Sequence, residues 1–378
     1  MGAKPIRVTF LGLRGFPGVQ GGVETHAEHL CPLLAAMDCE VEVIVRSPYQ
    51  NHALRRSWQG VRLTPLWSPR SKALEAVAHT FLGVLYAGCV RRPDVLHIQA
   101  IGPALLTPLA RLLGLRVVVT HHGPDYERQK WGRFARLALR LGERFGMRWA
   151  HGRIVISEAV RALVRKKHRV DPALIPNGVT LPEIPPGTGT PHQFGLTPGK
   201  YLLLVSRLVP EKRHMDLIEA FRRAKLADWR LAIVGASDHP DDYAHRVLNV
   251  AAETPGVVCT GFQSGEALRE LYAHAGLFAL PSSHEGLPIA MLEALSYGLP
   301  VIASAIPANL EVGLPQKHYF PVGDVEALAA KLRQFASQPP SLDARDARRI
   351  WVCSRYDWNG IARQTVAVYR DVLSGKRV

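Results

Sequence analysis

The sequence predicts an α/β protein made of two doubly wound, parallel-sheet domains that face each other across a cleft. The chain has 378 residues, which is roughly twice the usual domain size. Short β-branched runs alternate with helical patterns in both halves, an order typical of parallel sheets. Between residues 177 and 200 prolines and glycines cluster, so neither pattern continues and a linker is expected.

The expected elements follow in order along the chain. In the N-terminal half, apolar runs predict strands at 7–13, 40–46, 95–100 and 116–120, with helices at 23–37 and 103–113. In the C-terminal half, the alternation predicts strands at 201–206, 230–234, 257–260, 277–280 and 300–304, with helices at 213–225, 242–254, 265–274 and 288–297. We therefore expect an N-terminal domain over 1–182, a C-terminal domain over 183–355 and a closing helix within 356–378.

Composition restricts the class of protein. The five cysteines are scattered without a Cys-x-x-Cys pair, which indicates core residues in a reducing cytoplasm rather than a metal or dithiol site. The N-terminus lacks the basic start, apolar run and cleavage site of a signal peptide, so export is not expected. No stretch of about 18 residues is apolar throughout, so no membrane span is expected.

The positive charge is concentrated in the N-terminal half. Residues 1–182 hold 26 basic and 12 acidic residues, whereas the remainder holds 21 and 20. This asymmetry predicts that the N-terminal half contacts an anionic partner, which can be anionic lipid, nucleic acid or a phosphorylated substrate.

Two loops of the C-terminal half carry groups suited to a phosphorylated sugar. Amides at Gly286 and Leu287, ahead of a helix that starts at Pro288, form an anion site together with the helix dipole. A phosphate would repel a neighbouring carboxylate, so we expect Glu285 to bind the uncharged hydroxyls of a sugar or ribose. In the loop after the strand at 201–206, Arg207 and Lys212 are two cations able to reach one diphosphate. Each motif alone also fits a capping glutamate or ordinary surface cations.

The N-terminal half offers two further features, a glycine-rich loop and a pair of histidines. The loop after the first strand lacks the Gly-x-Gly-x-x-Gly pattern, and the strand at 40–46 ends in Arg46 rather than an acid, which disfavours a dinucleotide cofactor. Its glycines permit close backbone approach to a ligand. His121 and His122 end another strand, where an imidazole can donate to a substrate hydroxyl or simply be a structural ring.

Taken in order, these motifs resemble family 4 of the retaining glycosyltransferases, of the bacterial cell-surface polysaccharide type, whose GT-B fold pairs two Rossmann-like domains. The resemblance covers nearly the whole chain. It rests on 21–24, on His122 with Gly123 and Asp125, on 130–132 and 176–179, on Arg207 with Lys212, on the E-x7-E pair of Glu285 and Glu293, and on 298–301.

The resemblance implies a role for each matching residue. Arg207 and Lys212 would neutralise the donor diphosphate together with the backbone amides around Gly286, Leu287 and Pro288, and Gly21 and Gly22 would pass beside it. Glu285 would hold hydroxyls of the donor sugar, Glu293 the ribose, and His122 the transferred sugar. His121 is the alternative to His122, which we favour because it directly precedes Gly123. Family members generally need no metal, and the chain has no Asp-x-Asp pair, so no metal or cofactor is expected.

A basic stretch from 128 to 148 bears on the acceptor. Apolar residues at Phe134, Leu137, Leu141 and Phe145 run beside basic ones, which predicts a helix suited to an anionic membrane surface. The alternative is a solvated face that covers a core stripe. We expect peripheral attachment to the inner face of the cell membrane and disfavour nucleic acid, since no binding module accompanies the charge. The residues expected to meet membrane and acceptor are Arg133, Arg136, Arg140 and Arg144.

The expected function is that of a retaining, metal-independent hexosyltransferase of polysaccharide biosynthesis. It would move a hexose from a nucleotide-diphosphate sugar to a lipid-linked saccharide, with leaving-group stabilisation rather than covalent catalysis. A sugar-nucleotide epimerase of the same fold and an inert nucleotide-sugar-binding subunit are the alternatives. GDP-mannose and UDP-glucose both fit as donors, because contacts to the base come mostly from backbone and variable side chains.

Overall fold

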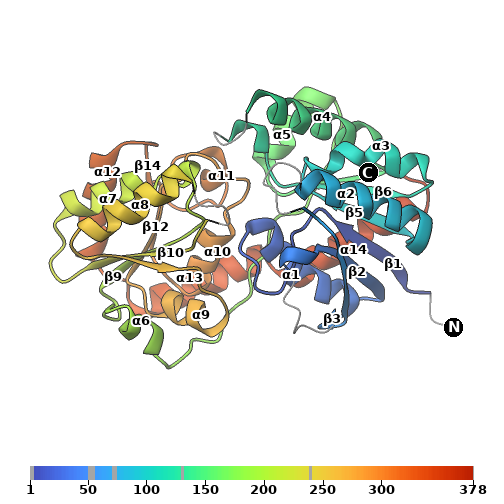
Figure 1. Cartoon of the computed structure of the whole chain (residues 1–378). Coiled ribbons are helices and arrows are strands. Elements are labelled where there is room, and N and C mark those ends of the chain that lie inside the picture. The colour runs from blue at the N-terminus through green and yellow to red at the C-terminus, as the bar shows by residue number, and fades with distance from the viewer. Residues whose placement is uncertain (1–3, 50–55, 70–74, 129–131, 238–240, 378) are drawn as a thin grey trace. The chain divides into compact units, whose positions relative to one another are not determined.

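The computed structural model describes residues 4–49, 56–69, 75–128, 132–237 and 241–377, which form two compact units (Figure 1). One unit comprises Met1–Asn177 with Trp358–Val378, and the other comprises Gly178–Asp357. These limits differ from the predicted ones, 1–182 and 183–355. The Val179 amide donates to the Tyr356 carbonyl at 2.8 Å, so the two ends of the second unit are hydrogen-bonded to each other.

The described part of the first unit contains an eight-stranded sheet in the order β3-β4-β2-β1-β5-β6-β7-β8. All neighbouring pairs are parallel except β3 with β4. The central strands are buried on both faces, as their continuous apolar runs predict. The strands are β1 (Ile6–Leu11), β2 (Cys39–Arg46), β3 (Ser57–Trp58), β4 (Val61–Leu66), β5 (Val95–Gln99), β6 (Val117–His121), β7 (Gly152–Val155) and β8 (Ala173–Leu174).

Helices connect these strands. The predicted helix at 103–113 is divided into a 3-10 turn and a short α-helix, η3 (Pro103–Leu106) and α3 (Thr107–Leu112). The others are α1 (Gly22–Ala35), η1 (Ser47–Tyr49), α2 (Glu75–Tyr86), the π-helical η2 (Ala87–Arg91), η4 (Asp125–Glu127), α4 (Arg133–Trp149), α5 (Glu158–His168) and α14 (Trp358–Leu373).

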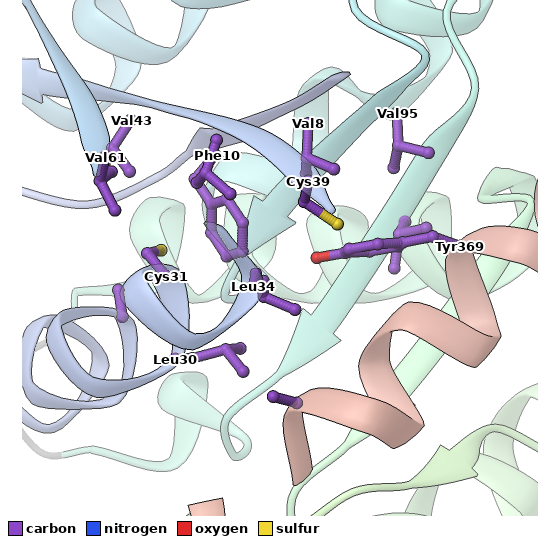
Figure 2. Packing of buried hydrophobic residues seen from close by; sticks show 14 of the residues in the cluster. Val8, Phe10, Leu30, Cys31, Leu34, Cys39, Val43, Val61, Val95 and Tyr369 are labelled. Carbon is purple, nitrogen blue, oxygen red and sulfur yellow. The ribbon is translucent and has the colours of Figure 1, made fainter. Parts of the chain in front are cut away.

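The closing helix α14 completes the core of the first unit. Figure 2 shows Tyr369 of α14 beside residues of β1, β2 and α1, among them Val8, Leu34 and Cys39. The Tyr369 hydroxyl also lies 2.7 Å from Nδ1 of His97 on β5. The last helix of the chain is therefore part of the N-terminal core.

The described residues of the second unit form a six-stranded sheet, all parallel, in the order β11-β10-β9-β12-β13-β14. Its strands are β9 (Tyr201–Val205), β10 (Arg230–Val234), β11 (Val257–Gly261), β12 (Leu277–Leu280), β13 (Val301–Ser304) and β14 (Tyr319–Phe320). Its helices are α6 (Gly189–Gln193), η5 (Pro210–Lys212), α7 (His214–Ala224), α8 (Asp242–Glu253), α9 (Gly265–Ala273), α10 (Ile289–Ser296), α11 (Pro307–Leu310), η6 (Gln316–His318), α12 (Val325–Ala336) and α13 (Leu342–Arg355).

The fold class is confirmed, since each unit is a doubly wound α/β layer structure. Among the described residues, no helix is both long enough and apolar enough to cross a bilayer. The cysteines are all unpaired, but they are not uniformly core residues: Cys31 and Cys39 are buried, whereas Cys89 is exposed.

Candidate active site

The strand order of the second unit reverses between β9 and β12. From β9 the chain builds outward to β10 and β11, and it then returns to the other side of β9 to add β12, β13 and β14. Ligands of open α/β sheets bind at the carboxyl ends of the strands at such a reversal. The two loops that leave the sheet there are the ones that carry Arg207 with Lys212 and Glu285.

These two loops are bonded to each other. Lys212, the last residue of η5, donates from Nζ to Oε1 of Glu285 at 2.5 Å. The Ser283 amide donates to the carbonyl of Glu211 at 2.8 Å. The Lys212 and Glu285 side chains are 18% and 10% exposed, so the pair is shielded but reachable. The structure thus brings together two residues predicted from separate motifs.

Arg207 lies in the same turn, just beyond the carboxyl end of β9, and is half-buried. The turn is fixed by His214, whose Nε2 lies 2.9 Å from Oγ of Ser206 and whose amide donates to the Tyr243 hydroxyl at 3.0 Å. Burial, and secondarily the charge of Lys212, lowers the pKa of His214 to about 3. His214 is therefore a neutral support of the turn at physiological pH.

The anion site predicted at Gly286, Leu287 and Pro288 lies where α10 begins. The helix starts at Ile289, one residue later than predicted, and extended Pro288 precedes it. The Met291 and Leu292 amides both donate to the Pro288 carbonyl, so hydrogen bonding of the helix begins there. The N-terminal end of α10, towards which its backbone amides point, therefore adjoins the loop that carries Glu285.

Glu293 sits in the middle of α10 and is held by a tyrosine. Its Oε2 accepts from the Tyr272 hydroxyl at 2.9 Å, and Tyr272 stacks on Tyr297 with ring centroids 5.4 Å apart. Burial, together with the nearby Glu293 charge, raises the pKa of Tyr297 to about 12. Tyr272 therefore orients the half-buried carboxylate of Glu293, the residue expected to bind the ribose.

The strand order of the first unit reverses in the same way between β1 and β5. The two loops at this reversal pack closely, because Gly12 has φ of 108° and a Cβ there would lie 2.5 Å from the Gln99 carbonyl oxygen. The glycine-rich loop therefore reaches the carboxyl ends of β1 and β5, where a ligand is expected.

Gly21 and Gly22 differ in what surrounds them. A Cβ at Gly21 would lie 2.1 Å from Oε2 of Glu24, whereas nothing lies within 4 Å of one at Gly22. Glu24 accepts from Nε of Arg14 at 3.1 Å; burial acts to raise its pKa, but the Arg14 charge outweighs that and the pKa is lowered. Gly21 thus makes room for a buried ion pair, while Gly22 leaves open space beside its backbone.

The two adjacent histidines have different environments. His121, the last residue of β6, is fully buried and accepts at Nδ1 from the Gly123 amide at 3.0 Å. His122 is half-buried, and its Nε2 lies 2.7 Å from Oε1 of Gln99. Burial lowers the pKa of His122 to about 3, with smaller effects from His121 and His97. His122 is therefore a neutral ring, and it is the more accessible of the pair.

Three residues around His122 were not predicted as site residues. His26 of α1 packs edge-on against the His122 ring at 5.1 Å, and its Nδ1 lies 3.0 Å from Oδ1 of Asn177. Gln99 orients His122 from β5. Two polar residues, His97 and Gln99, lie two positions apart in an otherwise apolar strand, and this pattern could have indicated a site at β5. No local sequence pattern indicates His26.

The basic stretch forms α4, and two of the four apolar residues predicted to run beside its basic ones are strongly exposed. Leu139 and Gly142 face the protein, whereas Phe134 is 90% exposed and Leu137 is 56% exposed. Another face of α4 does cover a core, through Leu139 and Met147, so the structure excludes a core position only for Phe134 and Leu137. Lys130 and Trp131 of the motif at 130–132 lie outside the described residues.

The four arginines predicted for membrane and acceptor fall into two groups. Arg136, Arg140 and Arg144 line a cavity of about 660 Å³, and Arg133 does not. In the part of the chain that the structure describes, there is no group of three or more His, Cys, Asp or Glu side chains able to hold a metal ion.

The two doubly wound units match the expected GT-B class of fold, and comparison with known proteins agrees. The sequence model described as "Glycosyltransferase Family 4" matches residues 20–182, and that described as "Glycosyl transferases group 1" matches residues 192–349. Between them the two models span most of the chain. The chain belongs to the family 4 glycosyltransferases.

Individual relatives are more distant. The chain is 30% identical over 187 residues to the GDP-mannose:cellobiosyl-diphosphopolyprenol alpha-mannosyltransferase of Komagataeibacter xylinus, which covers 47% of each chain. It is 29% identical over 305 residues to the GDP-mannose-dependent alpha-(1-6)-phosphatidylinositol monomannoside mannosyltransferase of Mycolicibacterium smegmatis, covering 72% of this chain and 74% of that one. The chain thus spans about half the length of the first of these relatives and about three quarters of the second.

Among solved structures, sucrose-phosphate synthase of Thermosynechococcus elongatus superimposes with a TM-score of 0.83 at 21% identity. The match covers 98% of this chain and 100% of that chain. At this level of identity the likeness establishes the fold.

Proposed function

We propose that this protein is a retaining, metal-independent hexosyltransferase that moves a hexose from a nucleotide-diphosphate sugar to a lipid-linked saccharide. The observation that carries the proposal is the Lys212–Glu285 pair at the reversal between β9 and β12. There a cation for the diphosphate and a carboxylate for sugar hydroxyls stand side by side. The relatives named above are transferases, which gives the epimerase alternative no support.

The second unit would hold the donor. Arg207 and Lys212 neutralise the diphosphate, and this interaction strengthens as the nucleotide departs and its charge grows. The amide end of α10 adds to the same anion site. Glu285 accepts hydrogen bonds from hexose hydroxyls, and Glu293, oriented by Tyr272, accepts them from the ribose. Leaving-group stabilisation of this kind requires no carboxylate nucleophile.

The first unit would meet the transferred sugar. Because His122 donates from Nε2 to Gln99, the neutral ring keeps Nδ1 as an acceptor for a sugar hydroxyl. Asn177 is hydrogen-bonded to His26, and His26 packs against the His122 ring and holds it in place. Gly22, with open space beside it, lets the backbone approach the donor phosphate.

The acceptor would be reached at a membrane surface. Phe134 and Leu137 project from α4 among exposed arginines, a combination that binds the interface of anionic lipid. The two curated relatives act on acceptors whose names specify a diphosphopolyprenol and a phosphatidylinositol. We propose peripheral attachment at the cytoplasmic face of the membrane through α4.

A donor-consumption assay tests the activity. GDP-mannose and UDP-glucose are supplied with and without a polyprenyl-diphosphate saccharide, and release of nucleotide is followed. Release that requires the lipid acceptor supports the proposal. Conversion of the donor without acceptor identifies an epimerase, and nucleotide binding without any turnover identifies a binding subunit.

A sedimentation assay with phosphatidylglycerol vesicles tests the attachment. Replacing both exposed apolar residues, as F134S/L137S, should reduce the bound fraction at low salt without changing the unfolding temperature, because neither side chain packs in the core. A control variant, L112S, removes one exposed leucine of α3. Equal vesicle binding by wild type and F134S/L137S would refute attachment through this face.

A further inference from the structure

A cavity of about 660 Å³ lies in the first unit, beside the basic helix α4. It is open to solvent and is lined by residues of η4, α4 and α5. Three arginines enter it from one helix at successive spacings of four residues, which places them on one face. The lining residues are Tyr126, Glu127, Arg136, Arg140, Glu143, Arg144, Lys167 and His168.

The buried acid of this cavity is already engaged. Glu143 is 2% exposed and lies 2.8 Å from Nε2 of His168 and 3.8 Å from Nζ of Lys167. Tyr126 is bonded to Lys167 and flanked by Arg140, whose guanidinium carbon lies 5.6 Å from the centre of its ring. Glu143 therefore serves to fix the wall of the cavity.

The arginines, in contrast, have no acidic partner. Among the described residues, no carboxylate lies within 4.0 Å of Arg136, Arg140 or Arg144, and the adjoining residues 129–131 include no acid. The Nε of Arg136 is buried and has no hydrogen-bond partner in the part that the structure describes. Like charges four apart on a helix repel each other, so an external anion would relieve this arrangement.

We propose that this cavity binds the diphosphate group of the acceptor. The inference rests on the proposed function and assigns a site to one part of that acceptor. Planar guanidinium groups bind phosphate oxygens in pairs, so three on one face suit two linked phosphates. Lys167 supplies a fourth cation from α5. The apolar stripe of α4 would lie in the lipid while its arginines hold the diphosphate.

Two pairs of substitutions on the same helix separate this site from general membrane charge. R140Q/R144Q removes two exposed cations that line the cavity, and R133Q/R148Q removes two exposed cations that do not. Both are made in a K212M background, so that diphosphate binding at the proposed donor site is weakened. Inorganic diphosphate and farnesyl diphosphate are titrated by calorimetry, and phosphatidylglycerol vesicles by sedimentation.

R140Q/R144Q should weaken binding of both diphosphates by about 100-fold, at about tenfold for each lost charge-assisted contact. R133Q/R148Q should leave both affinities within about threefold. Vesicle binding should fall equally in the two pairs, because each loses two charges. If only farnesyl diphosphate responds, the lipid chain is needed for entry and the site still stands.

The inference is overturned if the two pairs bind diphosphate equally, or if the K212M parent binds none. Its failure differs from failure of the proposed function. Acceptor-dependent transfer with equal acceptor KM in R140Q/R144Q and R133Q/R148Q, now with Lys212 intact, rejects the cavity and keeps the transferase. Diphosphate binding lost only in R140Q/R144Q, with no donor turnover in wild type, keeps the cavity and rejects the transferase.

Discussion

Replacing Lys212 by methionine is the most informative perturbation of the proposed donor site. K212M keeps the length of the side chain but removes the ammonium that lies 2.5 Å from Glu285. At this distance the gross attraction is about 7 kcal/mol at an effective dielectric constant of about 20, most of which offsets desolvation. For a pair that keeps some exposure, we expect a net loss of about 1–2 kcal/mol in the free energy of unfolding.

The effect on catalysis should be larger than the effect on stability. A charge-assisted hydrogen bond to phosphate contributes about 1.5–3 kcal/mol, and a donor aimed at charge that develops in the transition state contributes about 10²–10³ in rate. We therefore expect kcat/KM for the nucleotide sugar to fall at least about 100-fold, while the unfolding temperature falls by only about 2–5 °C.

Acceptor-dependent nucleotide release and differential scanning fluorimetry measure the two effects. K200M is the matched control, because Lys200 is exposed at the amino end of β9, the opposite edge of the sheet. It should retain kcat/KM within about twofold. If K212M keeps kcat/KM within threefold of wild type with both GDP- and UDP-sugars, Lys212 does not neutralise the leaving diphosphate and the reasoning is wrong.

Three further predictions concern the first unit. H122F should lower transfer at least about 100-fold yet leave the nucleotide-induced thermal shift intact, and unchanged turnover would reject its role. G22A should change the free energy of unfolding by less than about 0.5 kcal/mol and still impair transfer. In G142A, by contrast, the new Cβ would lie 2.0 Å from a backbone oxygen, so the free energy of unfolding in urea should fall by about 2–3 kcal/mol. Burial lowers the pKa of His97 to about 3, so on acidification the unfolded chain binds this proton before the folded chain does. The free energy of unfolding therefore falls as pH drops below about 6.5. H97N should remove about 2 kcal/mol of the loss between pH 7 and 5, and an unaltered pH dependence of stability would contradict this.

The periodic patterns predicted the central strands of both sheets well. β5, β6, β9, β10 and β12 lie within or close to their predicted ranges, because strands buried on both faces are continuous apolar runs. The peripheral strand β4 escaped prediction because its sequence, VRLTPL, mixes polar residues and a proline with apolar ones. Local patterns of this kind resemble loops.

The proximity of the residues proposed to bind the donor was predictable from local patterns. Glu285, Arg207 and Lys212 each follow a strand end, and parallel strands bring their carboxyl ends to one edge. His26 and Asn177 were not predicted as site residues, since they are 151 positions apart and meet only through packing. The cavity between α4 and α5 could likewise not be predicted from the sequence, because it depends on how the two helices pack.

The sequence by itself determined the two α/β units, the family and the residue types of the loops proposed to bind the donor, since these follow from patterns a few residues long. Only the tertiary structure decided that α14 belongs to the first unit, that His121 is buried while His122 is reachable, and that Phe134 faces outward. Each of these depends on which distant segment covers a surface, and burial is a property of the packed chain rather than of any local stretch.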